Sequence, residues 1–176
     1  MNHPFVNLPS NRRMPLFLLS LAVTLMIFAI FRVLDAPLRT PAAPNGVVSF
    51  ELAGKLETAT EILNSWDERA KLFATFGLGV DFLFMPFYAL ALSLGILLAA
   101  GRHAGAFAKV GAWLGWGAFV AALFDAVENY SLWQLMTGNL QEIWPNLAAF
   151  CATVKFGLLL LGLAYALIGW LWPRGK

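Results

Sequence analysis

Four stretches of this chain are each long and apolar enough to cross a lipid bilayer as an α-helix. A bilayer core about 30 Å thick requires roughly 20 apolar residues in helical form. The four stretches cover residues 15–34, about 72–100, 110–136 and about 147–172. A chain of 176 residues that is 60% hydrophobic and only 12% charged cannot hide so much apolar surface inside itself. The sequence therefore predicts a single all-α membrane domain over residues 1–176, built as a membrane-embedded four-helix bundle.

Basic residues in the short loops predict the side of the membrane on which each end of the chain lies. They flank the apolar stretches at three places, Arg12–Arg13, Arg102–Lys109 and Arg174–Lys176. These places share one side if all four stretches cross, and the short loop on the opposite side, Thr137–Asn146, has no basic residue. Because basic loops stay in the cytoplasm, a multi-pass inner-membrane protein with two cytoplasmic termini is predicted. The first stretch is interpreted as an uncleaved anchor, since Pro37 makes a poor signal-peptidase site.

Tryptophans lie near the ends of the apolar stretches, where an amphipathic ring suits the membrane interface. Those predicted at the outer boundary are Trp66, Trp133 and Trp144, and those near the inner one are Trp113, Trp170 and Trp172. Their positions agree with the four-span assignment.

The long first outer loop is predicted to contain an additional amphipathic helix over about residues 49–64. Its apolar positions recur at spacings of three and four residues, the period of an α-helix. They are Leu52, Leu56, Ala59, Leu63 and Trp66. Glu51 and Lys55 are spaced for an i,i+4 ion pair, and Ser65 with Glu68 is interpreted as a capping box that starts the second span. This helix lies flat at the outer interface, covers the bundle mouth, or simply connects two spans; the sequence leaves these alternatives open.

Charged residues inside the apolar stretches are the main functional clue. They are Asp81, Asp125, Glu128 and Lys155. An unpaired charge at the bilayer centre costs roughly 2.5–3.5 kcal/mol. Lys155 is estimated to lie at the depth of Asp81 and Asp125, on a face of small residues, so it is predicted to pair with one or both acids. Two interpretations remain: an ion-pair network that sets helix register, or a pocket for a small molecule, a lipid headgroup or a proton.

The candidate ligand-binding residues are taken from these inward-facing positions. Asp125, Glu128 and Asn129 share one helix face at i, i+3 and i+4. Pro86 cannot donate a helical hydrogen bond and is expected to kink the second span beside Asp81. The full candidate set is Asp81, Tyr88, Asp125, Glu128, Asn129 and Lys155. No residue is assigned a catalytic role.

Histidine and cysteine are too few for several kinds of membrane chemistry. Cys151 is the only cysteine, which excludes an intrachain disulfide or a paired-thiol redox site. His3 and His103 lie outside the apolar stretches and cannot ligate a two-haem or di-iron bundle. No metal or cofactor is therefore expected. The net charge of +2, with no basic run longer than Arg12–Arg13, gives no reason to expect nucleic acid as a partner.

Four segments of the chain carry a resemblance to known proteins. They are SFELAG at Ser49–Gly54, SWDERA at Ser65–Ala70, GVDFLFMPFY at Gly79–Tyr88 and FDAVENYSL at Phe124–Leu132. Together they resemble an uncharacterised family of small bacterial four-span membrane proteins, over most of residues 45–160. This resemblance implies a topology and no activity. In style the chain is also similar to the emopamil-binding and sigma-2 receptor group, whose bundles hold ligands near buried acids, but its residues are not matched one by one to that group's motif and no catalytic role is transferred.

Several kinds of function fit these observations. The favoured one is an integral membrane protein, with the lipid bilayer as its partner, that binds a small amphiphile or lipid in a polar pocket between helices. One alternative is a membrane enzyme, such as an isomerase or lipid-modifying enzyme, that uses a buried carboxylate. Another is a proton or ion pathway formed by a homo-oligomer, and a fourth is a structural subunit of a larger membrane complex.

Overall fold

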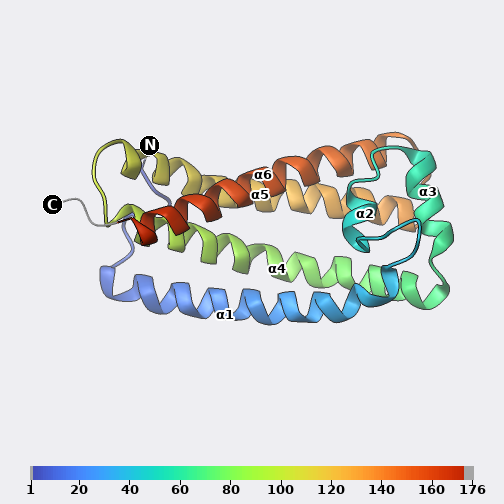
Figure 1. Ribbon diagram of the computed structural model, residues 1–176, viewed down its shortest axis with the longest axis horizontal. Helices are drawn as coiled ribbons and strands as arrows, with labels where there is room; N and C mark the ends of the chain where they lie inside the picture. The colour runs from blue at the N-terminus through green and yellow to red at the C-terminus, as the bar shows by residue number, and fades with distance from the viewer. Residues whose placement is uncertain (1, 173–176) are drawn as a thin grey trace. The chain divides into compact units, whose positions relative to one another are not determined.

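The computed structural model describes residues 2–172, and every regular element in that part of the chain is helical (Figure 1). The four long helices are α1 (Ser10–Leu34), α4 (Glu68–Ala100), α5 (Ala106–Met136) and α6 (Ile143–Leu171). Three short elements, η1 (Ala36–Leu38), α2 (Val47–Glu51) and α3 (Leu56–Ser65), lie between α1 and α4. The predicted all-α class is confirmed. Arg174 and Lys176, which entered the orientation argument, lie outside the described residues.

All four predicted apolar stretches are helices, and each helix begins before its apolar run does. α1 begins at Ser10 instead of Pro15, and α4 begins at Glu68 instead of Leu72. Hydropathy marks only the part of a helix that avoids water, whereas backbone hydrogen bonds continue through polar first turns. The long helices contain 25 to 33 residues, which is about 38–50 Å at 1.5 Å per residue. Each is long and apolar enough to cross a membrane.

The chain divides into two compact units, and each long helix contributes a part to both. The first unit contains residues 1–25, 86–123 and 155–176, and the second contains residues 26–85 and 124–154. By sequence, all ten acidic residues belong to the second unit, together with five basic ones. The first unit has the other seven basic residues and no acid. The two units thus carry opposite net charge.

Small residues let the helices of the first unit approach closely. A methyl group added at Gly169 of α6 would come within 2.8 Å of the Ala99 side chain of α4. Gly111 of α5 faces Ala100 and Tyr165, and the Tyr165 hydroxyl donates to the Phe107 carbonyl at 2.8 Å. Small side chains at such positions allow membrane helices to pack through extensive van der Waals contact.

The segment before α1 is docked onto the first unit. The His3 side chain is buried against Gly115 of α5, and its Nδ1 accepts a hydrogen bond from the Phe5 N–H. Trp116 Nε1 donates to the Asn2 carbonyl at 3.0 Å. Burial lowers the pKa of His3 to about 4, and the charge of Arg13 acts in the same direction. The backbone at Ser93 lies near the ring without a well-formed hydrogen bond and opposes this shift only in part.

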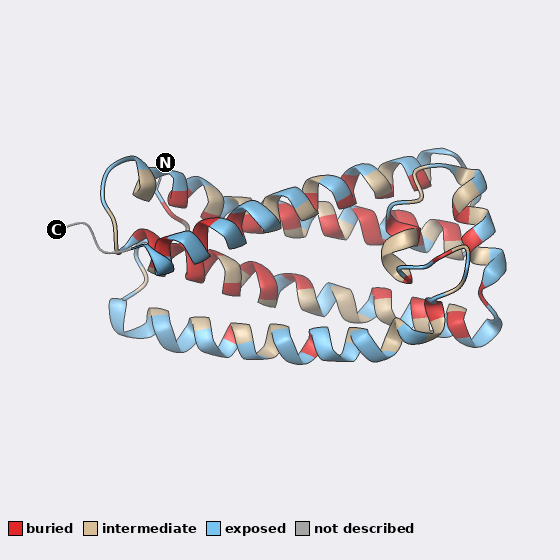
Figure 2. Ribbon diagram, in the orientation of Figure 1, coloured by how far each residue is buried: buried red, intermediate tan, exposed pale blue. Residues whose placement is uncertain are grey.

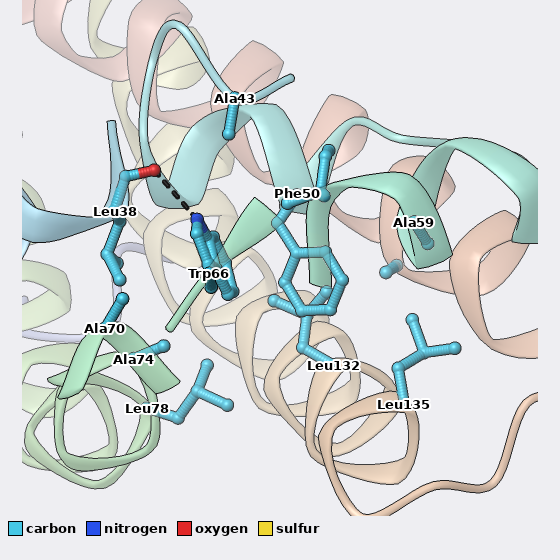
Figure 3. Close-up of a cluster of buried hydrophobic side chains, with 12 residues drawn as sticks. Leu38, Ala43, Phe50, Ala59, Trp66, Ala70, Ala74, Leu78, Leu132 and Leu135 are labelled. Atoms are coloured by element: carbon cyan, nitrogen blue, oxygen red, sulfur yellow. Dashed lines mark hydrogen bonds between the residues drawn. The ribbon is translucent and has the colours of Figure 1, made fainter. Parts of the chain in front are cut away.

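The loop between α1 and α4 folds into a cap on the second unit, formed by η1, α2 and α3 (Figure 1). Trp66 is at its centre, with its ring edge-on to Phe50 and its Nε1 donating to the Leu38 carbonyl at 2.8 Å (Figure 3). Side chains of α4 and α5, including Leu78 and Leu132, complete the apolar cluster. The loop is therefore a packed part of the second unit.

The additional amphipathic helix predicted in this loop is α3, but the predicted bounds of 49–64 are too wide, because the segment forms two helices. Gly54, with φ of +68°, adopts a left-handed conformation between α2 and α3. The break shifts which positions after it face the core, so the predicted set of apolar core-facing positions is only partly right. Ala59 and Trp66 are buried as expected, whereas Leu52 is 48% exposed and Ile62 takes a core position. Glu51 and Lys55 lie on either side of the break and do not share a helix.

Two further details of the cap correct the sequence interpretation. The N-cap of α4 is Asp67, whose Oδ1 accepts a hydrogen bond from the Ala70 N–H at 2.7 Å. Ser65, the predicted cap, is instead the last residue of α3 and its hydroxyl donates to the Ile62 carbonyl. Trp66 is only 2% exposed, so its ring packs inside the cap instead of lying on the surface, and its position at the outer membrane boundary stays a prediction. Both differences arise because α3 extends to the residue directly before Trp66.

Large apolar side chains remain on the outside of all four long helices. α1 is the least buried of them (Figure 2). Examples more than half exposed are Leu19, Met26, Val33, Leu72, Phe76, Trp113, Leu123, Phe150, Leu160 and Leu161. So many exposed large apolar side chains are unusual on a protein that is surrounded by water.

Candidate functional site

The candidate site is a row of polar side chains on the buried face of α5, within the second unit. Asp125, Glu128 and Asn129 are exposed by only 2%, 0% and 1%. Their neighbours Val127 and Tyr130 are exposed on the other side of the helix. The predicted shared face at i, i+3 and i+4 is therefore confirmed, and it points into the protein.

α4 provides the partner for this row. Asn129 Nδ2 donates a hydrogen bond of 2.8 Å to Asp81 Oδ2, and Asp81 is half-buried. A hydrogen bond to a carboxylate is among the stronger side-chain interactions. The sequence grouped Asp81 with Asn129 as candidates, and the structure brings these two side chains into direct contact.

The polar row lies one helical turn from the apolar cluster of the cap. Along α5, Glu128 is followed one turn later by Leu132, and along α4, Asp81 is preceded one turn earlier by Leu78. Both leucines belong to the cluster beneath Trp66 (Figure 3). Both helices thus change from apolar to polar next to the cap cluster.

Carboxyl groups buried this deeply have a definite chemical requirement. An ionised carboxylate removed from water needs a proton, a cation or several hydrogen-bond donors to balance its charge. Asn129 supplies one such donor to Asp81. Among the described residues, no group of three His, Cys, Asp or Glu side chains is arranged to hold a metal ion. The row is suited to accept protons or to bind the amine or hydroxyl end of a ligand.

The remaining two candidates belong to the first unit. Lys155 is 5% exposed, with its Nζ 4.7 Å from the centre of the Phe156 ring, and Tyr88 is 6% exposed. Their burial agrees with the predicted inward orientation. The pairing of Lys155 with Asp81 or Asp125 stays a prediction.

Arg102 and His103 are not among the candidate site residues predicted from the sequence. The structure places both in the wall of a pocket of about 690 Å³ in the first unit. The signal that pointed to this region was the charge distribution, because residues 86–123 contain Arg102 and Lys109 but no acid.

Comparison with known proteins finds no family model, no curated protein and no solved structure that matches this chain. What the protein does is therefore inferred from its own residues.

Proposed function

We propose that the chain is a multi-pass protein of a bacterial inner membrane, with four spans and both termini in the cytoplasm. Four long apolar helices with exposed leucine, phenylalanine and tryptophan side chains support membrane embedding. The orientation is supported by the first unit, which includes both termini and carries basic residues without acids. The resemblance to small four-span bacterial proteins is consistent with this topology and stays part of the proposal.

Within this protein, the polar row of the second unit binds the polar end of a small amphiphile or lipid. The observation that carries the proposal is the complete burial of Asp125, Glu128 and Asn129 on one face of α5. Ionisable groups inside membrane helices are energetically costly and rare, and those that occur commonly mark binding or transport sites. The adjoining cap cluster is apolar and buried, and polar contacts to a bound ligand are stronger in such low-dielectric surroundings.

One observation favours a second candidate, a structural polar network. The Asn129–Asp81 hydrogen bond joins α4 to α5 without any ligand, and a bond of this kind sets the register of two membrane helices. A structural network and a ligand site differ in their response to conservative substitution. Replacing a ligand-binding carboxyl with its amide removes the ligand and leaves the fold, whereas the same change in a register-setting network lowers stability.

The test is mass spectrometry of ligands that co-purify with the full chain in mild detergent. Wild type is compared with Asp125→Asn and Glu128→Gln, and Glu61→Gln on the exposed side of α3 serves as the matched control. We expect a small amphiphile or lipid bound to wild type and to Glu61→Gln, and its loss from both buried variants at unchanged melting temperature. Retention of the ligand by both buried variants would exclude the polar row as its site. Unfolding of both variants without any bound ligand in wild type would establish the structural network.

Topology has its own test. Reporter fusions after Lys176 and within residues 41–46 should report opposite sides of the membrane, with the first one cytoplasmic. The same side for both fusions would contradict the four-span arrangement.

A further inference from the structure

A pocket in the first unit lies outside the polar row and has no part in the function proposed above. It forms where the turn between α4 and α5 meets the C-terminal end of α6, and it has a volume of about 690 Å³. Its wall includes Arg102, His103, Ala104, Phe107, Ile168 and Trp172. A cavity of this size accommodates a headgroup with the first part of an acyl chain.

Arg102 provides the charge of this pocket. Its guanidinium carbon lies 5.2 Å from the centre of the Trp170 ring, and this cation–π contact holds the side chain in place. Its Nε is buried and, among the described residues, has no hydrogen-bond partner. A guanidinium offers five donors in a planar fork that matches phosphate oxygens. Because the first unit has no aspartate or glutamate in its sequence, no acidic side chain of that unit competes for this fork.

The helix ends around the pocket also favour an anion. α5 begins at Ala106, directly after Gly105 turns the chain with φ of +69°. The first turn of α5, whose first N–H groups have no partner within the helix, adjoins the pocket through Phe107. The carbonyls at the end of α6 would oppose an anion, but two of them already have partners. His103 Nε2 contacts the Gly169 carbonyl at 3.0 Å, and the Trp172 N–H donates to the Ile168 carbonyl at 2.8 Å.

The apolar part of the pocket wall favours a lipid over a free anion as the ligand. Ile168 is 50% exposed and Trp172 is 65% exposed. Phe107 also lines the pocket, with its ring centre 4.7 Å from that of His103. We propose that this pocket binds the phosphate group of an anionic phospholipid, with Arg102 in contact with the phosphate and the apolar wall along the acyl chain. Basic pockets between membrane helices on the cytoplasmic side recognise lipid headgroups in this way. The inference rests on the membrane embedding proposed above and is independent of the amphiphile site.

The test uses the full chain in a zwitterionic detergent, with short-chain phosphatidylglycerol or phosphatidylcholine of the same chain length added. Melting temperature and native mass spectrometry are measured for wild type, Arg102→Gln, Arg102→Lys and the control Lys109→Gln, which removes an exposed charge outside the pocket. We expect phosphatidylglycerol, and not phosphatidylcholine, to stabilise wild type and Lys109→Gln. Binding should weaken roughly ten-fold or more in Arg102→Gln, because a charge-assisted hydrogen bond is lost, and less in Arg102→Lys.

Three outcomes decide the proposal. Equal effects of the two lipids on wild type, or equal losses in Lys109→Gln and Arg102→Gln, would overturn it. If inorganic phosphate at millimolar concentration alone reproduces the stabilisation, the pocket binds phosphate, but its ligand is a free anion and not a phospholipid. Should Arg102→Gln fail to fold, Arg102→Lys and native mass spectrometry of wild type still separate the two lipids. Asp125→Asn should retain the phosphatidylglycerol effect, which distinguishes failure of this site from failure of the amphiphile site.

Discussion

The two units are built from parts of the same four helices, but they differ in charge and in how they pack. The first has seven basic residues, no acid, and helices that pack on glycine and alanine. The second contains every acid of the chain, a folded cap and a buried polar row. The glycine and alanine faces of the first unit pack directly against one another, whereas the buried polar row of the second unit adjoins the apolar cluster of the cap. The cap and the polar row thus occur in the same unit, the one that contains the acidic residues.

The largest expected effect concerns the cap. Trp66→Ala removes the ring at the centre of the cluster and its hydrogen bond to the Leu38 carbonyl. We expect a loss of about 3–5 kcal/mol, the usual cost of emptying a buried tryptophan site. Thermal unfolding in detergent and limited proteolysis within residues 41–66 would measure it. The matched control is Trp133→Ala, since Trp133 is 47% exposed, and equal losses in both variants would show that the cap contributes little to the second unit.

The next effect concerns the packing of the first unit. Gly169→Ala places a methyl group within 2.8 Å of Ala99 and about as close to Phe107, so the helices must shift. Overpacking of this kind costs about 1–3 kcal/mol. Gly157→Ala in the same helix has open space around it and should be neutral or slightly stabilising. Melting temperatures that fall equally in the two variants would argue against close contact at Gly169.

A smaller effect tests which residue caps α4. Asp67→Ala removes the acceptor for the Ala70 N–H, and we expect a loss of about 1 kcal/mol. Chemical denaturation of the purified protein would detect it, with Thr75→Ala on the exposed face of α4 as the control. A Glu68→Gln variant should be nearly neutral, because Ser65 is not the cap and the predicted capping box is absent. A larger loss in Glu68→Gln than in Asp67→Ala would restore the capping-box interpretation.

The most local effect is a pH dependence confined to the first unit. The pKa of His3 is lowered to about 4 when the segment is docked, from 6.5 when it is free. The free segment therefore binds more protons between these values. The contribution of neutral His3 to the stability of docking is fully present above about pH 6.5 and is lost as the pH falls through about 4. Hydrogen exchange of residues 2–9, corrected for intrinsic rates, should rise over this window. His3→Gln should remove the pH dependence while the second unit is unaffected, and the same pH dependence in His3→Gln would contradict the assignment.

The sequence by itself determined the four long helices and the inward face of α5. Both follow from local rules, because an apolar run of this length has to satisfy its backbone hydrogen bonds as a helix. In addition, i, i+3 and i+4 positions share a face in any helix. The burial of Asp125, Glu128 and Asn129 could be predicted for this reason.

Only the tertiary structure decided the cap, the Asn129–Asp81 contact and the Arg102 pocket. In the cap, the left-handed turn at Gly54 broke a pattern that reads as continuous helix, and Trp66 turned inward to a carbonyl distant in sequence. The pocket depends on the end of α6 meeting the α4–α5 turn, which no local pattern encodes. Sequence periodicity specifies the faces of one helix, but contacts between elements depend on how separate segments pack, and that is a property of the folded chain.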